Sequence, residues 1–321
     1  MASVLWLSQK DVNAAGLEAL ECIDLVRKST RWRALGLLEV PPKIAIHPPR
    51  GRHINAMPAF AGVIPAAGMK WIADFPQNRQ LGIPTIQGIV VLSDPDTGTP
   101  LCVMDGASIT AARTAAMTAL SLQTCALPGV TTGAIVGTGT EARSHVLTLP
   151  RGLPTLKTLR IVGRTRDAAD RFCEMLQPNS EVELSPGIDR EAAVRQAGIV
   201  VTVTNATTTP LLEANWLSPG TTVVVLDNPG KETKILDCFD RVIVDDPHPF
   251  ATDEVKRRFP MGVPVIDADL GEILTSRVRG RTNAEERILV MNLGSAACDV
   301  VVAQEIYARC KASGSGTVVE L

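Results

Sequence analysis

Residues 134–142 of the chain read AIVGTGTEA, an apolar run that ends in a G-x-G-x-x-A turn and leads into a helical pattern. A dinucleotide cradle requires this order. Gly137 would make the tight turn from strand to helix, Gly139 would let backbone approach a pyrophosphate, and Ala142 would let the helix pack on the strand. The helix N-terminus would present N–H groups to the phosphates. Because glycine-rich turns also occur simply as turns, the motif needs support from its surroundings.

A second apolar strand, residues 159–162, ends shortly before the position that reads the ribose in such folds, about 26 residues after Gly137. An NAD site usually has Asp or Glu there, whereas this chain has Gly163, Arg164 and Thr165. A carboxylate would repel a 2′-phosphate, but a guanidinium and a hydroxyl would hold one. We therefore predict NADP(H) as the preferred cofactor, with NAD(H) as the alternative. The other interpretation of Arg164 is an ordinary solvated loop cation.

The composition is that of a globular protein, with 321 residues, 45% hydrophobic and 21% charged. This length suffices for about two domains. A net charge of −2 and an aromatic content of 3% disfavour a nucleic-acid partner. Neither a membrane span nor a signal peptide is predicted. Seven scattered Cys and four unclustered His predict reduced thiols, a cytoplasmic location and no metal site.

In the first third of the chain, the sequence pattern changes at about residue 39 from helical spacing to short extended runs. Apolar spacing predicts one helix over residues 8–38, with Ser8 as its cap. Short extended runs broken by Pro and Gly then predict a largely antiparallel sheet over residues 39–105, with a hairpin turn at 94–100. Residues 107–126 form a predicted helix of small residues suited to close packing.

From about residue 130 to 290, predicted strands alternate with predicted helices, which argues for a parallel doubly wound sheet. The predicted strands are 133–136, 158–162, 182–184, 199–204, 222–226 and 241–244, and the predicted helices are 141–150, 166–176, 189–197 and 252–259. A last apolar helix, 294–312, could pack back on the first domain.

The predicted fold class is therefore α/β: a Rossmann doubly wound parallel sheet plus an α+β substrate and dimerisation domain with a largely antiparallel sheet. We place the substrate and dimerisation domain at residues 1–127 and the NAD(P)-binding domain at 128–292. Residues 293–321 are predicted to return to the first domain as a C-terminal helix.

Two cations lie in unusually apolar surroundings. Lys70 falls inside an apolar strand, where desolvation would lower its pKa toward general-base use; the alternative is an edge-strand lysine that reaches water. Arg113 is the only charge in a long helix of small residues. It needs an anionic partner, either a bound carboxylate or phosphate or an internal salt bridge, for which Asp105 is the candidate.

Two strand ends carry polar groups where open α/β sheets bind ligands. Asp227 follows one strand and could exchange a proton with substrate, although an Asp before Asn-Pro-Gly also forms ordinary turns. The Thr-rich segment 201–210, which contains Thr202 and Thr204, lies at the end of another strand, and its hydroxyls and free backbone groups could line the nicotinamide or ribose. A solvated loop is the alternative there.

These pieces together resemble the ornithine cyclodeaminase/mu-crystallin family over residues 40–310. The resemblance is carried by Gly68-Met69-Lys70-Trp71, Gly82-Ile83-Pro84-Thr85, Val103-Met104-Asp105-Gly106, Thr110-Ala111-Ala112-Arg113-Thr114-Ala115-Ala116, the Gly137 turn and Leu293-Gly294-Ser295-Ala296-Ala297-Cys298-Asp299. It implies a Rossmann domain plus a substrate and dimerisation domain built from both chain ends, and a homodimer.

The resemblance also implies roles for individual residues. Lys70 and Asp227 would be catalytic, Lys70 by taking part in proton transfer and Asp227 as the acid/base near the reacting carbon. Lys43, Lys70 and Leu293 would contact substrate. The implied cofactor contacts are Thr85, Arg113, Gly137, Gly139, Thr140, Glu141, Thr202, Thr204, Lys231 and Asn292. Arg164 and Thr165 are further predicted cofactor contacts, because they lie at the position that reads the ribose.

The chain departs from the family pattern at three places. Lys43 stands where ornithine cyclodeaminase has an Arg for the substrate carboxylate; it keeps the charge but loses the bidentate fork, for which Arg50 or Arg52 could substitute. The segment from Gly220 to Asp227 is about two residues shorter, which leaves the acid/base role of Asp227 open. The Arg164 segment resembles the NADP-using mu-crystallin branch.

Three functions follow as hypotheses. The first is an NAD(P)H-dependent imino-acid (ketimine) reductase, equivalently an amino-acid dehydrogenase, which passes hydride between nicotinamide C4 and the α-carbon of a small amino or imino acid. The second is an ornithine or lysine cyclodeaminase that uses bound NAD catalytically and releases ammonia. The third is a non-catalytic, NADP-dependent binding protein for a small ligand.

Overall fold

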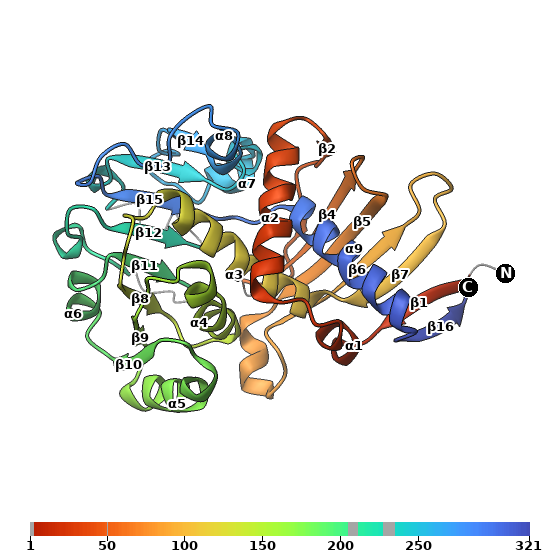
Figure 1. Cartoon of the computed structure of the whole chain (residues 1–321), viewed down its shortest axis with the longest axis horizontal. Helices are drawn as coiled ribbons and strands as arrows, with labels where there is room; N and C mark the ends of the chain where they lie inside the picture. The colour runs from red at the N-terminus through yellow and green to blue at the C-terminus, as the bar shows by residue number, and fades with distance from the viewer. Residues whose placement is uncertain (1–2, 50, 205–210, 227–234) are drawn as a thin grey trace. The chain divides into compact units, whose positions relative to one another are not determined.

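The computed structural model describes residues 3–49, 51–204, 211–226 and 235–321 (Figure 1). The chain forms two compact units, the first comprising Met1–Arg113 with Gly294–Leu321 and the second Thr114–Leu293. The boundary falls inside helix α3 (Gly106–Cys125), whereas the boundary predicted from the sequence lies after this helix, at residue 127. Each unit is built on one sheet.

The first unit contains a mixed, largely antiparallel sheet, called sheet A here. Its described strands run in the order β16-β1-β7-β6-β5-β4-β2, with β3 paired to β4. The predicted antiparallel meander is confirmed in β4 to β7, and Gly98 (φ 72°) lies in the predicted hairpin turn. The strands are β1 (Ser3–Leu7), β2 (Leu38–Glu39), β3 (Ile44–Ile46), β4 (His53–Ala61), β5 (Ala66–Asp74), β6 (Ile86–Ser93), β7 (Pro100–Asp105) and β16 (Thr317–Glu320).

The two ends of the chain both join this sheet. β1 pairs in parallel with β7, and β16 pairs antiparallel with β1, with Ser3 opposite Glu320. The sequence analysis placed no strand at either end. Both strands are short. β1 buries only Val4 and Leu7 and β16 is exposed throughout, so neither carries the strong alternation that reveals a half-buried strand.

The single helix predicted over residues 8–38 is wrong. It is divided into α1 (Gln9–Ala14) and α2 (Ala19–Ala34), because Gly16 at φ 66° cannot continue a right-handed helix. The predicted cap is confirmed: the Ser8 hydroxyl accepts a hydrogen bond from the Asp11 N–H at 3.3 Å.

One face of sheet A is covered by α9 (Ala296–Ser313), which contacts β4, β5 and β6 and also packs against α2 (Figure 1). Close approach is possible because strand β5 carries Gly68, where an added Cβ would lie 3.5 Å from Val300 of α9. Side chains on this face, such as Val90 and Leu92, are fully buried. The predicted C-terminal helix is thus present and belongs to the first unit.

The second unit contains a parallel sheet, called sheet B, with the described strand order β10-β9-β8-β11-β12-β15-β13-β14. The first five strands in chain order therefore lie 3-2-1-4-5, the Rossmann arrangement, and the order reverses between β8 and β11. The strands are β8 (Thr132–Val136), β9 (Thr158–Val162), β10 (Glu183–Gly187), β11 (Ile199–Thr202), β12 (Thr222–Val225), β13 (Arg241–Val244), β14 (Ala268–Asp269) and β15 (Ile288–Met291). The sequence analysis missed β14 and β15.

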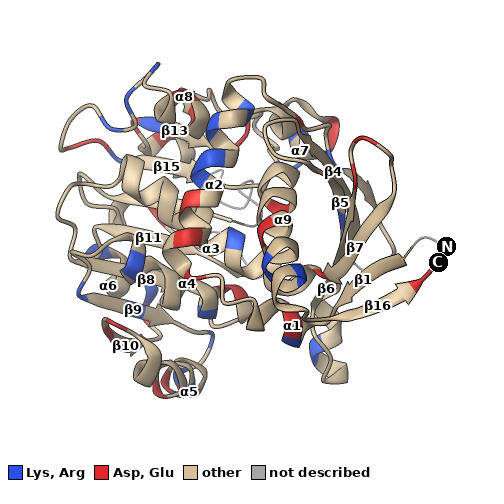
Figure 2. Ribbon diagram, turned by 45° about the vertical axis from the view of Figure 1, so that its right-hand side comes forward, with Lys and Arg blue, Asp and Glu red and all other residues tan. Residues whose placement is uncertain are grey.

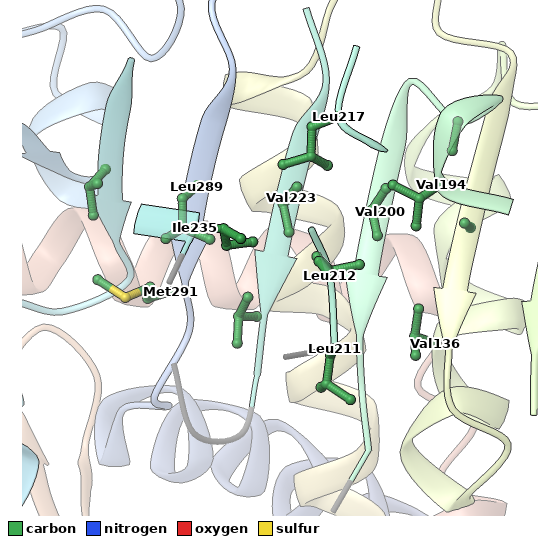
Figure 3. Close-up of a cluster of buried hydrophobic side chains, with 14 of the residues drawn as sticks. Val136, Val194, Val200, Leu211, Leu212, Leu217, Val223, Ile235, Leu289 and Met291 are labelled. Carbon is green, nitrogen blue, oxygen red and sulfur yellow. The ribbon is translucent and has the colours of Figure 1, made fainter. Parts of the chain in front are cut away.

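The core of the second unit follows the strands of sheet B. Figure 3 shows Val136, Val200, Val223 and Leu289 on β8, β11, β12 and β15, all within one buried hydrophobic cluster. Burial of each such side chain contributes roughly 1.5–3 kcal/mol. Because both faces of a parallel sheet are covered, these strands read as continuous apolar runs rather than as alternating ones.

Short helices connect the strands of sheet B in chain order. They are α4 (Thr140–Gly152), α5 (Arg166–Leu176), α6 (Arg190–Arg195), α7 (Asp253–Lys256) and α8 (Leu270–Leu274), with 3₁₀ turns η2 (Gln177–Asn179), η3 (Ala214–Trp216) and η5 (His248–Ala251); η1 (Pro76–Leu81) belongs to the first unit. The predicted helix 252–259 is shorter in the structure. Only α7 is helical, and the chain continues in turns up to Pro260. Across the described ranges, no helix is long and apolar enough to cross a membrane.

A buried histidine joins α4 to α3 within the second unit. The His145 imidazole has no exposed surface. Its Nδ1 lies 2.6 Å from the Glu141 carbonyl oxygen, and its Nε2 lies 2.9 Å from the Thr118 hydroxyl. Burial lowers the pKa of His145 to about 4, despite the opposing effect of the Glu141 carbonyl. The ring is therefore neutral in the folded protein at neutral pH.

Acidification should destabilise the protein through this group. Between its ordinary pKa of 6.5 and the folded value of about 4, the unfolded chain binds a proton at His145 that the folded chain does not. This difference lowers the free energy of unfolding by about 2 kcal/mol between about pH 7.5 and about pH 5. Urea unfolding at both pH values measures it. His145→Gln should remove this part of the pH dependence; an unchanged dependence in the variant would contradict the assignment.

Candidate functional site

The predicted phosphate turn joins β8 to α4. The Gly137 N–H donates to the Val162 carbonyl at 2.9 Å, which ties the turn to the neighbouring strand β9. Gly137 adopts φ 142°, and a Cβ at this position would lie 2.2 Å from the Val203 carbonyl oxygen. Only glycine fits here, so the backbone of the turn can lie directly against the end of β11.

The N-terminus of α4 is open to a ligand. Gly139 is its N-cap and provides no side-chain cap, and an added Cβ on Gly139 would meet nothing within 4 Å. The backbone N–H groups of the first turn, which starts at Thr140 and Glu141, therefore keep their capacity to bind an anion. The predicted role of this turn in binding a dinucleotide pyrophosphate stays a prediction.

Other predicted cofactor residues lie along the same carboxyl edge of sheet B. Arg164 and Thr165 follow β9, Thr202 ends β11 with Thr204 just beyond, and Asn292 follows β15. Ligands of open α/β sheets bind at this edge, where the strand order reverses. In sheet B that reversal is between β8 and β11, next to the phosphate turn.

The ribose position has one available cation. Arg164 is exposed and makes no hydrogen bond or ion pair with any residue in the described part of the chain. Its neighbour Arg166 instead pairs with Asp170 one turn along α5, at 2.9 Å. The Thr165 hydroxyl caps α5 by accepting from the Ala168 N–H at 3.2 Å, which leaves its own proton to donate.

Two predicted contact residues are engaged inside the second unit. The Asn292 amide is buried and donates to the Ser121 hydroxyl of α3 at 3.1 Å. The Leu293 N–H donates to the Asp245 carboxylate at 3.1 Å. Sequence reasoning missed Ser121 and Asp245, since their partners are distant in the chain and neither belongs to a local motif.

The first unit contains a buried cluster of three charges. The Lys70 Nζ lies 2.7 Å and the Arg113 Nε lies 2.9 Å from one carboxylate oxygen, Oδ1 of Asp299. The side chains of Lys70 and Asp299 have no exposed surface, so Lys70 is not an edge lysine that reaches water. Asp299 ends the last family-like stretch in the sequence, which was the only signal that could have singled it out.

The salt-bridge partner considered for Arg113 was Asp105, and this is wrong. The Asp105 carboxylate caps α3, accepting from the Ser108 N–H at 2.8 Å and the Ala107 N–H at 3.4 Å. Asp105 is thus satisfied by the helix that it begins. The cation seven residues into α3 binds Asp299 instead.

The remaining predicted residues are dispersed. Lys43 is half-buried and directly precedes β3, while Thr85 directly precedes β6, where its carbonyl accepts from the Phe75 N–H at 2.8 Å. The Arg52 guanidinium stacks 5.3 Å above the Phe75 ring. The predictions for Asp227 and Lys231, and for Arg50 as a substitute for Lys43, lie outside the described residues.

Two further features bear on where a ligand could bind. A cavity of about 920 Å³ in the second unit is lined by residues 123, 124, 126–128, 273 and 276–284, most of which lie shortly before β8 or β15. It therefore lies at the amino ends of the strands, away from the phosphate turn. Among the described residues, no group of three or more His, Cys, Asp or Glu is arranged to hold a metal ion.

Two glycine substitutions should separate folding from cofactor binding. Gly137→Ala places a methyl group 2.2 Å from a carbonyl oxygen and should lower the free energy of unfolding by about 2 kcal/mol or more. Gly139→Ala enters open space and should cost less than about 1 kcal/mol, but its methyl group should weaken NADPH binding at least about tenfold. Urea unfolding and fluorescence titration with NADPH measure the two effects. Wild-type affinity in Gly139→Ala would argue against the pyrophosphate position.

Known proteins resemble this chain over its whole length. The model of the ornithine cyclodeaminase/mu-crystallin family matches residues 4–314. The nodulation efficiency protein NfeD of Rhizobium meliloti is 34% identical over 99% of this chain and 99% of its own. The Delta(1)-pyrroline-2-carboxylate reductase of Bacillus cereus is 29% identical over 90% of this chain and 94% of its own.

A solved structure shows the same fold. An archaeal alanine dehydrogenase dimer with bound NAD superposes with a TM-score of 0.87 at 25% identity, covering 99% of both chains. This likeness confirms the predicted α/β fold class with its parallel and largely antiparallel sheets. Two of the three relatives are oxidoreductases by name, and the match of the family model covers both units. The chain belongs to the ornithine cyclodeaminase/mu-crystallin family.

Proposed function

We propose that this protein is an NAD(P)H-dependent imino-acid (ketimine) reductase, which also runs in reverse as an amino-acid dehydrogenase. The phosphate turn at Gly137 carries the proposal, because its geometry fits a dinucleotide and related proteins are a reductase and a dehydrogenase of small imino or amino acids. The remaining site residues are assigned from their positions in the family pattern.

In the proposed reaction, the α-carbon of a C=N bond accepts a hydride and its nitrogen takes up a proton, giving the amino acid. When bound, a reduced nicotinamide supplies that hydride. Lys43 and Lys70 hold the substrate carboxylate by charge, and Lys70 with Asp227 manages the proton; Leu293 contacts the substrate. The protein's contribution is orientation and exclusion of water.

The proposed cofactor contacts divide by chemistry. Backbone of Gly137, Gly139, Thr140 and Glu141 holds the pyrophosphate together with the side chains of Thr85 and Arg113, whereas Thr202, Thr204, Lys231 and Asn292 contact the nicotinamide half. At the ribose, Arg164 and Thr165 supply a guanidinium and a hydroxyl without a carboxylate. This set favours a 2′-phosphate, and NADP(H) is the proposed cofactor, with NAD(H) as the weaker one.

The function is tested by cofactor oxidation. The purified protein receives NADPH or NADH with cyclic ketimine carboxylates, or with 2-oxo acids plus ammonia or methylamine. Absorbance loss that depends on one imino substrate and is faster with NADPH supports the proposal. Ammonia release from ornithine or lysine without net cofactor oxidation would identify a cyclodeaminase instead. Cofactor binding without any turnover would identify a binding protein.

The cofactor preference should depend on Arg164. Arg164→Ser should raise KM for NADPH about 10–100-fold and leave KM for NADH nearly unchanged, because only NADPH carries the 2′-phosphate. Arg166→Ser is a matched control, since this neighbouring cation is already paired with Asp170. Steady-state kinetics with NADPH and with NADH measure KM for both cofactors in each variant. Equal effects of the two substitutions would show that Arg164 is a solvated cation.

We also propose a homodimer that buries the outer face of sheet A, the face opposite α9. This face carries exposed large apolar side chains, and β4 to β7 are mostly free of charges (Figure 2). Trp71 and Ile89 are cross-strand neighbours that remain 39% and 37% exposed, and Phe60 is 40% exposed. Exposed apolar patches of this kind mark interaction sites.

Sedimentation velocity tests the assembly. The wild-type protein should sediment at twice the 34.2 kDa chain mass. Trp71→Asp should yield monomer, because a carboxylate in an apolar interface loses its hydration. Met175→Asp places the same charge on an exposed apolar position of α5 and should leave the dimer intact. If the Trp71→Asp variant remains a dimer, the interface does not lie on the outer face of sheet A.

We propose a cytoplasmic location, because the cysteine thiols are not joined in disulfides. All seven cysteines lie in the described part of the chain without a disulfide. Reduced thiols persist in reducing compartments. Fractionation of the producing cell tests this, and recovery from an oxidising compartment would refute it.

A further inference from the structure

Asp299 lies in the first turn of α9 and joins two cations that the proposed reaction uses. Its Oδ1 accepts a hydrogen bond from the Lys70 Nζ at 2.7 Å and from the Arg113 Nε at 2.9 Å. The two cations come from different elements, β5 and α3. One oxygen atom therefore binds both nitrogen atoms and holds them close to each other.

Packing around α9 restricts Arg113 from a second side. Gly294, just before α9, has φ 78°, and a Cβ there would lie 2.7 Å from the Arg113 Nη1. The guanidinium therefore packs between the backbone at Gly294 and the carboxylate of Asp299. Both residues belong to the segment that leads into and begins α9, so this segment contacts Arg113 at two points.

Burial of the Asp299 carboxylate costs desolvation free energy, which calls for an explanation. Asp299 has no exposed side-chain surface, and its Oδ2 has no hydrogen-bond partner among the described residues. A pair of buried ions stabilises a fold little or not at all compared with apolar residues of similar volume. The buried charge at Asp299 is thus better explained by what it does to Lys70 and Arg113 than by stability.

The neighbouring Cys22 thiol does not supply a second negative charge. The Cys22 thiol of α2 interacts electrostatically with Arg113 and with Cys298 of α9. Burial raises the pKa of Cys22 to about 12, so that this thiol is neutral at working pH. The Asp299 carboxylate, in contrast, lies within hydrogen-bond distance of both cations.

We propose that Asp299 is a positioning residue for the reductase reaction: it orients the Lys70 ammonium toward substrate, keeps it protonated, and fixes Arg113 for the dinucleotide. The inference rests on the proposed function. A purely structural ion pair is the competing explanation. The two differ in their effect on the pH dependence of catalysis, since a structural pair affects only stability.

The test compares Asp299→Asn with Glu305→Gln. Both remove one carboxylate from α9, but Glu305 pairs with Arg309 at the surface. Asp299→Asn should lower kcat/KM for the imino substrate about 100-fold. In a plot of kcat/KM against pH, the alkaline limb of this variant should move to lower pH by about one unit or more, because the Lys70 ammonium loses its buried counter-ion. Glu305→Gln should match wild type in both measurements.

A lowered melting temperature in Asp299→Asn with wild-type kcat/KM and an unmoved alkaline limb would overturn the proposal. If this variant does not fold, Asp299→Glu keeps the charge and displaces it by one methylene. It should keep the wild-type alkaline limb while kcat falls. A wild-type kcat in Asp299→Glu would equally refute positioning by this carboxylate.

A separate binding measurement distinguishes this inference from the proposed function. If wild-type protein reduces no imine, the proposed function fails, but NADPH affinity still reports on Arg113. Fluorescence titration should then show at least about tenfold weaker NADPH binding in Asp299→Asn than in Glu305→Gln. Equal affinities would remove the positioning role as well.

Discussion

The burial of the Lys70 ammonium is the constraint on which the first unit depends. A charge without exposed surface in the middle of a strand requires a counter-ion at hydrogen-bond distance. Asp299 provides it from α9, so the C-terminal helix must return to sheet A after the chain has built an entire second unit. β16 then pairs with β1, and both chain ends finish on one sheet.

The second unit depends on backbone geometry rather than on charge. Its parallel strands end at a common edge, and the strand order reverses beside the Gly137 turn, where only glycine fits. N–H groups at the start of α4 and a solvated Arg164 are thus available to an anionic cofactor. Each unit has its own kind of polar group: the first buries three charges, and the second leaves the backbone amides at the start of α4 open.

Sequence patterns predicted the elements that repeat a strong local signal. The alternation of apolar strands with helices gave sheet B through β13, and Pro and Gly marked the hairpins of sheet A. Patterns failed where local signals were weak or misleading. Helical spacing ran through Gly16, so α1 and α2 were merged; β1, β15 and β16 are short, and their partners lie far away in the chain.

The sequence by itself determined the fold class and the phosphate turn, because a glycine turn between an apolar run and a helix is a local property that needs no distant partner. It also identified Lys70 and Arg113 as cations that require anions. Only the tertiary structure decided which anion they share. Asp299 lies 229 and 186 residues away from them, and nothing local can specify a contact across such a separation. Packing of α9 on sheet A brings the three charges together and excludes the water that would otherwise screen them.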